Sequence, residues 1–172
     1  MNLVLLESDE ISGGVAEFGG ARAEHVIKIL HGAPGRTLKT GVVGGLAGVS
    51  LITGVEDGRV RVECRHTDET PRPWADVVLA PPRPRVMKRL LPQLAALGAA
   101  RIVLVGAKKV EKDFWGATLL KEANYRPLLV DGMMQAGTTA LPAVEARRNF
   151  VRFMKDEADS MFAGAVRVVA HP

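Results

Sequence analysis

The pattern of apolar and polar positions divides the chain near residue 70 into two parts. In the first part, short β-type runs follow one another at residues 2–7, 36–43, 48–55 and 59–65. The Asp57-Gly58 pair between two of these runs is typical of a tight hairpin. Residues 21–30 instead repeat apolar residues at helical spacing. The pattern predicts a small β-barrel-like domain over residues 1–72.

The second part alternates strands with helices. Residues 75–82 form a strand-like run, residues 85–98 a helical pattern closed by Gly98, and residues 101–107 another strand-like run. Such a βαβ unit builds a parallel sheet. The pattern continues with a helix at 116–137, a strand at 141–148, a helix at 150–164 and a final strand at 165–172. The sequence therefore predicts an α/β parallel-sheet domain over residues 73–172.

Three residues within the helical patterns predict irregularities. Pro92 removes a backbone donor, so a kink is expected near Lys88, and Pro127 and Gly132 are expected to break or kink the next helix. In the last helix, four residues are expected on the inner face, namely Phe150, Phe153, Met154 and Met161. The final run, residues 165–170, is expected to return to the sheet as a buried strand.

Composition narrows the class of protein. With 172 residues, of which 47% are apolar, the chain can bury a core, and no stretch is apolar enough to cross a bilayer. The N-terminus turns acidic within ten residues, which is unlike a signal peptide. The single cysteine, Cys64, has no partner for an intrachain disulfide and is interpreted as a strand residue rather than a nucleophile. A reduced, cytoplasmic protein is expected. No residues have metal-ligand spacing, so no metal is predicted.

Charge is concentrated in one window of the chain. Residues 77–110 contain no Asp or Glu but seven basic residues, which are Arg83, Arg85, Lys88, Arg89, Arg101, Lys108 and Lys109. The net charge of the whole chain is only +4, so the basic excess is a local patch. A polyanion is the expected partner.

The first turns of the helix at 85–98 carry three of these cations. Arg85, Lys88 and Arg89 lie opposite an apolar stripe formed by Met87, Leu90, Leu91, Leu94 and Leu97. Cations are unfavourable at a helix N-terminus, whose free N–H groups attract anions. The residues are either an ordinary solvated surface or a phosphate site. The absence of acidic residues favours RNA or another phosphate ligand.

Five motifs in order resemble a known family. They are "RAEHVIKIL" followed by "PG", "LAPPRPRVMKRLLPQLAALGAARIVLV", "KKVEKDFW", "MMQAGTTALPAV" and "VVAHP". Their order and spacing are similar to those of the RsmE-type methyltransferases, and the resemblance runs the whole length of the chain. In that family a PUA-like RNA-binding domain precedes a SPOUT domain with a deep trefoil knot.

The resemblance implies an S-adenosylmethionine-dependent enzyme that methylates N3 of a uridine in 16S ribosomal RNA. It implies 16S RNA or the small ribosomal subunit as partner, no membrane association, and a homodimer in the complete family member. The positions that match RNA-side residues are Arg22, His25, Lys28, Arg83, Arg85, Lys88 and Arg89. Gln135 and His171 are the candidates for cofactor binding, and no catalytic residue is identified.

The family pattern continues past "AHP" to a Gly-Pro-Glu-Gly-Gly loop and a later Leu-Arg-x-Glu-Thr segment, which form the knot and most of the cofactor pocket. The chain is therefore expected to be C-terminally incomplete, and to bind S-adenosylmethionine weakly or not at all. Two alternatives remain. One is an RNA-binding module without catalysis, and the other is a small-molecule α/β enzyme whose basic helix binds a phosphorylated substrate.

Overall fold

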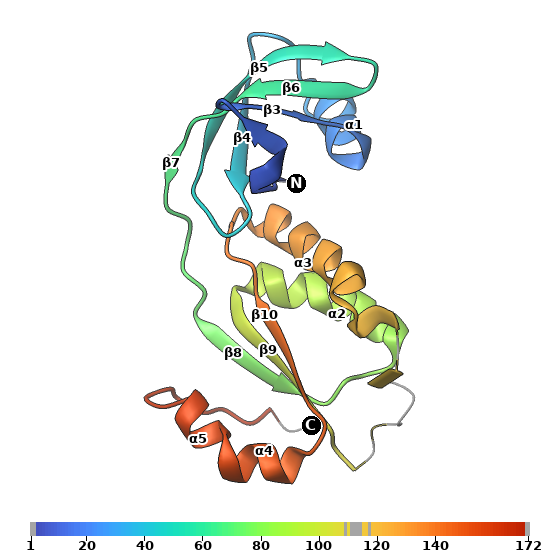
Figure 1. Ribbon diagram of the computed structural model, residues 1–172, viewed down its shortest axis with the longest axis vertical. Coiled ribbons are helices and arrows are strands. Elements are labelled where there is room, and N and C mark those ends of the chain that lie inside the picture. The colour runs from blue at the N-terminus through green and yellow to red at the C-terminus, as the bar shows by residue number, and fades with distance from the viewer. Residues whose placement is uncertain (1–2, 109, 111–114, 117, 171–172) are drawn as a thin grey trace.

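The structure is a computed structural model that describes residues 3–108, 110, 115–116 and 118–170 (Figure 1). Lys109, His171 and most of the "KKVEKDFW" segment lie outside the described residues. The elements are β1 (Val4–Leu6), η1 (Ser8–Glu10), β2 (Ile11–Ser12), β3 (Val15–Phe18), α1 (Gly20–Lys28), β4 (Thr37–Val42), β5 (Ala47–Glu56), β6 (Arg59–Glu63), β7 (His66–Asp68), β8 (Ala75–Leu79), α2 (Pro84–Leu97), β9 (Ala99–Val105), η3 (Thr118–Leu120), α3 (Glu122–Ala136), β10 (Ala143–Arg147), α4 (Phe150–Asp156) and α5 (Ala158–Met161). No helix in these described ranges has the length and apolar character needed to cross a membrane.

The N-terminal strands form one curled sheet, as the sequence predicts. Its order is β1-β4-β5-β6-β3-β2, with β7 paired to β5, and every pairing except β1–β4 is antiparallel. The β5–β6 hairpin turns through Asp57 and Gly58, both with positive φ, which is the backbone that a tight two-residue hairpin requires. The helix α1 packs Ala23 and Val26 against the inside of this nearly closed barrel. The predicted barrel is confirmed.

The second sheet is parallel, with the order β10-β9-β8, and confirms the predicted βαβ unit. Successive residues of β9 point to opposite faces, so Ile102 and Leu104 pack with α2 and α3, while Val103 and Val105 pack with Phe153 of α4. Both faces of the strand are therefore covered, which explains why its sequence is apolar without alternation.

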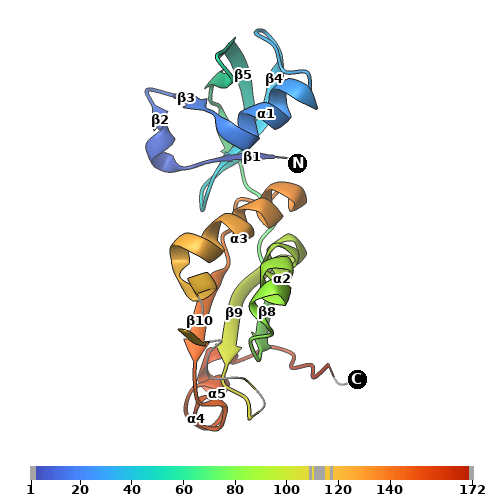
Figure 2. The same ribbon diagram turned by 90° about the vertical axis from the view of Figure 1, so that its right-hand side faces the viewer.

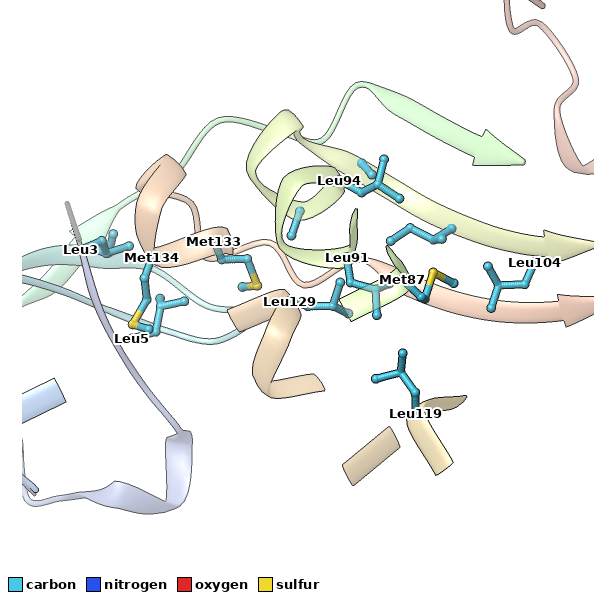
Figure 3. Packing of buried hydrophobic residues seen from close by; sticks show 14 residues of the cluster. Leu3, Leu5, Met87, Leu91, Leu94, Leu104, Leu119, Leu129, Met133 and Met134 are labelled. Carbon is cyan, nitrogen blue, oxygen red and sulfur yellow. The ribbon is translucent and has the colours of Figure 1, made fainter. Parts of the chain in front are cut away.

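The two sheets share a hydrophobic core. Figure 3 shows Leu3 and Leu5 of the barrel beside Met133 and Met134 of α3, in the cluster that also contains the inner face of α2. The backbone N–H of Leu3 donates to the carbonyl oxygen of Met134 at 3.2 Å. Residues 69–74, which include the predicted boundary at 72/73, form neither helix nor strand and connect the two sheets along one side (Figure 1). The boundary itself stays a prediction.

The helix α3 is not broken, contrary to one of the outcomes expected from its sequence. It runs from Glu122 to Ala136 without interruption through Pro127 and Gly132. It lies along α2, which is likewise continuous through Pro92. Burial of Leu129 and Met133 against α2 supplies the packing that holds the helix together despite its two unfavourable residues.

The prediction of a final strand at 165–170 is wrong. In the described residues this segment pairs with neither open edge of the parallel sheet, and its valines are 85–92% exposed. An alternating apolar run becomes a strand only where an edge and a covering layer are within reach. The expected inner face of the preceding helix is also only partly correct. Phe153 is buried and Met161 packs beside it, but Phe150 and Met154 are exposed.

Candidate nucleic-acid interface

The basic helix α2 begins at the carboxyl edge of the parallel sheet. Strand β8 ends at Leu79, and Arg83 is the N-cap residue that precedes Pro84, the first helical residue. The cap makes no side-chain hydrogen bond, and no acidic residue lies in the first turn. The positive end of the helix is therefore not neutralised by a side chain of its own first turn.

Four cations project from the first two turns into solvent. Met87 and Leu91 are buried and fix the rotation of the helix. The residues on its other side, Arg83, Arg85, Lys88 and Arg89, are exposed. Within the described part of the chain, none of these four forms an ion pair with a carboxylate. We call them the α2 patch. Such uncompensated charges favour an anionic partner. RNA binding by this patch stays a prediction.

Not every cation of residues 77–110, the stretch without Asp or Glu, is free to bind an external anion. Arg101 forms an ion pair with Asp76 at 3.3 Å, and its guanidinium lies 5.8 Å from the centre of the Phe162 ring. Asp76 lies one residue before the window and reaches Arg101 because β8 and β9 are neighbours. Lys108 is exposed.

The structure places Arg22 of α1 in an internal ion pair. Its guanidinium donates to both carboxylate oxygens of Glu10 and to the carbonyl oxygen of Leu5, at 2.5–2.9 Å, and lies over the ring of Phe18. The hydrogen bonds from Arg22 lower the pKa of Glu10 below its ordinary value, although burial opposes the shift. Arg22 is thus held in place by the barrel.

The other two α1 candidates differ from the α2 patch as well. Lys28 is exposed but pairs with Glu24 one turn earlier. His25 is half-buried, and its Nε2 is buried with no hydrogen-bond partner in the described residues. The helices α1, α2 and α3 all face the viewer in Figure 2, with α3 between the other two. Both groups of candidates therefore belong to helices on one side of the molecule.

The structure places only Gln135 of the two cofactor candidates. Gln135 lies near the end of α3, beside Met134, which contacts the barrel at the amino-terminal end of the parallel strands. His171 lies outside the described residues. Two cavities, of about 670 Å³ and 170 Å³, lie in the barrel and beside Trp74, away from the carboxyl edge of the sheet. Neither of these two cavities offers a nucleoside site at that edge.

The sequence also suggested roles for Cys64 and for possible metal ligands. Cys64, expected in a strand, lies one residue after the end of β6. Burial raises the pKa of its thiol, which lowers the thiolate fraction and disfavours a nucleophile. In the described ranges, no three His, Cys, Asp or Glu residues are grouped as a metal site.

Sequence reasoning missed three exposed residues beside the cavities. Arg36 and Lys39 line the barrel cavity, and Trp74 lines the smaller one, donating from Nε1 to the carbonyl oxygen of Leu97 at 2.8 Å. Leu97, expected in the apolar stripe, is half exposed at this cavity. No periodicity or motif marks these positions, because the cavities form between segments that are distant in sequence.

The family model and the relatives that match this chain are all described as RNA methyltransferases. Residues 68–172 match a family model described as RNA methyltransferase domain. The chain is 30% identical over 149 residues to ribosomal RNA small subunit methyltransferase E of Treponema pallidum (strain Nichols), with 84% of this chain and 56% of the relative covered. It is 26% identical over 156 residues to ribosomal RNA small subunit methyltransferase E 1 of Borreliella burgdorferi, with 90% and 65% covered. The chain thus spans less than two thirds of either relative.

Solved structures share the fold. A probable rRNA-methyltransferase from Porphyromonas gingivalis has a TM-score of 0.70 at 17% identity, over 92% of this chain and 65% of that chain. A ribosomal RNA small subunit methyltransferase E from Neisseria gonorrhoeae, bound to S-adenosyl methionine, has a TM-score of 0.64 at 17% identity, over 85% and 62%. These likenesses support the architecture of a barrel followed by a parallel sheet.

Proposed function

Because the chain belongs to the RsmE-type family of RNA methyltransferases, we propose that it binds 16S ribosomal RNA as part of an S-adenosylmethionine-dependent methyltransferase. The reaction of that enzyme is the methylation of N3 of a uridine. The observation that carries the proposal is the α2 patch, whose four exposed cations pair with no carboxylate in the described residues. Phosphate contacts of this kind supply most of the affinity of proteins for nucleic acids.

The α2 patch has a positioning role in this proposal. Its cations follow directly on β8, so a phosphate that they bind is held at the carboxyl edge of the parallel sheet. In open α/β sheets ligands bind at that edge. Cations hold RNA there without reading its sequence, so they fix the orientation of the strand and leave base recognition to other groups.

S-adenosylmethionine supplies an electrophilic methyl group, and the Neisseria relative contains it. Two observations support a low affinity of this chain for that cofactor: Gln135 lies at the far end of α3, and neither of the two described cavities is at the carboxyl edge. We propose that the 172-residue chain by itself binds S-adenosylmethionine weakly or not at all and does not methylate 16S RNA. A calorimetric titration tests this, and tight stoichiometric binding would refute it.

An exposed α2 patch, with neither of the two described cavities at the carboxyl edge, also favours a second function, an RNA-binding module without catalysis. Both functions require RNA binding, but only the methyltransferase requires S-adenosylmethionine. A chain that binds RNA but shows no methyl transfer from labelled S-adenosylmethionine would support the second. The resemblance implies a homodimer for the complete family member, and sedimentation velocity of a full-length relative beside this chain checks whether the 172 residues suffice for dimerisation.

The RNA interface is tested by the salt dependence of binding to a 16S RNA fragment. Replacing Arg85 and Lys88 together by Ala should weaken binding and reduce the slope of log affinity against log salt by about 1–2. The control is Arg152→Ala with Lys155→Ala, which removes the same charge from the exposed face of α4. Equal slopes for the two variants would mean that the α2 patch is an ordinary solvated surface. A shallow slope for the unmodified chain would instead favour a small phosphorylated ligand.

A further inference from the structure

The larger of the two cavities lies in the barrel, at the end of α1. Its volume of about 670 Å³ falls within the range of about 300–1,000 Å³ typical of small-molecule sites. Five of its lining residues are aliphatic and only 0–7% exposed, so they support the cavity from beneath, and these are Leu3, Val4, Val26, Leu38 and Ile52. Leu30, Arg36, Thr37 and Lys39 are exposed and form its accessible wall. The cavity thus presents one apolar side chain, one hydroxyl group and two cations at its entrance.

The charge of this entrance is not compensated. No carboxylate is among the lining residues, and in the described part of the chain Lys39 has no ion-pair partner. Arg36 donates from one Nη to the carbonyl oxygen of His31 at 2.7 Å, and this bond orients the guanidinium and leaves its charge unneutralised. An anion with an apolar part fits such an entrance, because Arg and Lys bind the charge while Leu30 contacts the apolar part.

The wall of the cavity is held by backbone contacts. The N–H of Gly32 donates to the carbonyl oxygen of Val26 at 2.9 Å, and the N–H of Gly35 donates to that of Ile52 at 2.8 Å. A β-carbon on Gly32 would lie 2.6 Å from Cγ1 of Val26, so only glycine lets the loop approach α1 this closely. The site is therefore formed before any ligand arrives, and little ordering entropy is lost on binding.

We propose that this cavity receives one unpaired nucleotide of the bound RNA, with the base against Leu30 and Thr37 and its phosphate between Arg36 and Lys39. The inference rests on the proposed function, which supplies the RNA, and it adds a base-binding site separate from the α2 patch. Among the described lining residues, Thr37 is the one uncharged side chain able to hydrogen-bond a base edge. The site therefore selects an unstacked base by shape and charge, with little preference for its identity.

A single-stranded RNA carrying one 2-aminopurine between adenines tests the proposal. The fluorescence of 2-aminopurine is quenched by stacking, and the cavity lining contains no aromatic side chain. Emission should therefore rise when the base leaves its stack and enters the cavity. In the Arg36→Ala, Lys39→Ala variant most of this rise should be lost. Its affinity should fall about three- to tenfold, and its salt slope by about 0.7, the value for one phosphate of a single strand.

The matched control is again Arg152→Ala with Lys155→Ala, which changes the net charge equally on α4, at the opposite end of the molecule (Figure 1). All four substituted side chains are exposed, so the fold should be retained. A second variant, Leu30→Asp, puts a negative charge at the entrance and should also abolish the rise.

The outcomes separate this inference from the proposed function. RNA binding with an unchanged emission rise in the Arg36→Ala, Lys39→Ala variant overturns the nucleotide site and leaves the α2 patch intact. No RNA binding by the unmodified chain overturns both. Displacement of the RNA from the cavity by polyglutamate, but not by oligouridine of equal charge, identifies an acidic protein segment as the occupant and also overturns the proposal.

Discussion

Gly132 of α3 lies so close to Pro92 of α2 that a β-carbon on Gly132 would be 2.1 Å from the carbonyl oxygen of Pro92. The two residues that disfavour helix in their own sequences thus meet where the helices pack together. The absence of a side chain at Gly132 allows the backbones to approach, and the approach buries Leu129 and Met133 in the shared core. The packing of α2 against α3 therefore offsets the low helix propensity of both Pro92 and Gly132.

Replacing Gly132 by Ala should destabilise the protein by about 1–2 kcal/mol. Ala improves helix propensity by about 1 kcal/mol, but the clash is with backbone and overpacking costs about 1–3 kcal/mol. Urea denaturation measures the change. The control is Gly54→Ala, whose β-carbon would meet only Cβ of Arg61 at 3.8 Å. A stabilised Gly132→Ala variant would show that the helices do not approach this closely.

The Arg22–Glu10 ion pair should make stability depend on pH. Arg22 lowers the pKa of folded Glu10 below 4.5, so the stabilisation is complete above pH 4.5 and is lost as the pH falls through the lower folded pKa. Glu10→Gln should cost roughly 1 kcal/mol at pH 7, because the pair is partly exposed. The difference from the unmodified protein should disappear in acid. The control is Glu56→Gln, at an exposed position without an ion pair in the described residues; it keeps the Arg22–Glu10 pair and should therefore keep the pH dependence of the unmodified protein.

The connection between the two sheets should be the earliest site of limited proteolysis. Residues 69–74 lack helix and strand, and Glu69 and Trp74 are exposed. A glutamate-specific protease should cut after Glu69 and chymotrypsin after Trp74, whereas Pro73 protects Arg72 from trypsin. Mass spectrometry of early digests identifies the cuts. Earlier cleavage inside either sheet would contradict two domains joined at 72/73.

The exposed valines near residue 168 should contribute nothing to folding stability. Val168 is 85% exposed, so Val168→Asp should change the free energy of unfolding by less than about 0.5 kcal/mol. Val103 is fully buried in β9, and Val103→Asp should unfold the protein or cost several kcal/mol.

The same valines should promote self-association, because they expose apolar surface. Sedimentation velocity should show less association for Val168→Asp than for the unmodified chain. A large loss of stability in Val168→Asp would instead mean that this segment pairs as a strand.

The features that could be predicted from the sequence are those that depend on residues close together along the chain. Period-two runs and the Asp57-Gly58 turn predicted the barrel hairpin, and the stripe containing Met87 and Leu91 predicted which side of α2 would carry its cations. These predictions hold because alternation and helical spacing decide which side chains share a face, whatever the face later contacts.

Contacts between distant segments determine which charges are compensated, whether the helices continue through Pro92, Pro127 and Gly132, and where cavities form. Arg22 and Arg101 cannot be told from the α2 cations in the sequence, but Arg22 forms an ion pair with Glu10 and Arg101 forms one with Asp76 of the neighbouring strand. Residues 165–170 have the pattern of a strand but lie in solvent, because a strand also needs a neighbouring edge. Each of these outcomes depends on a partner supplied by another segment, and local periodicity carries no information about that partner.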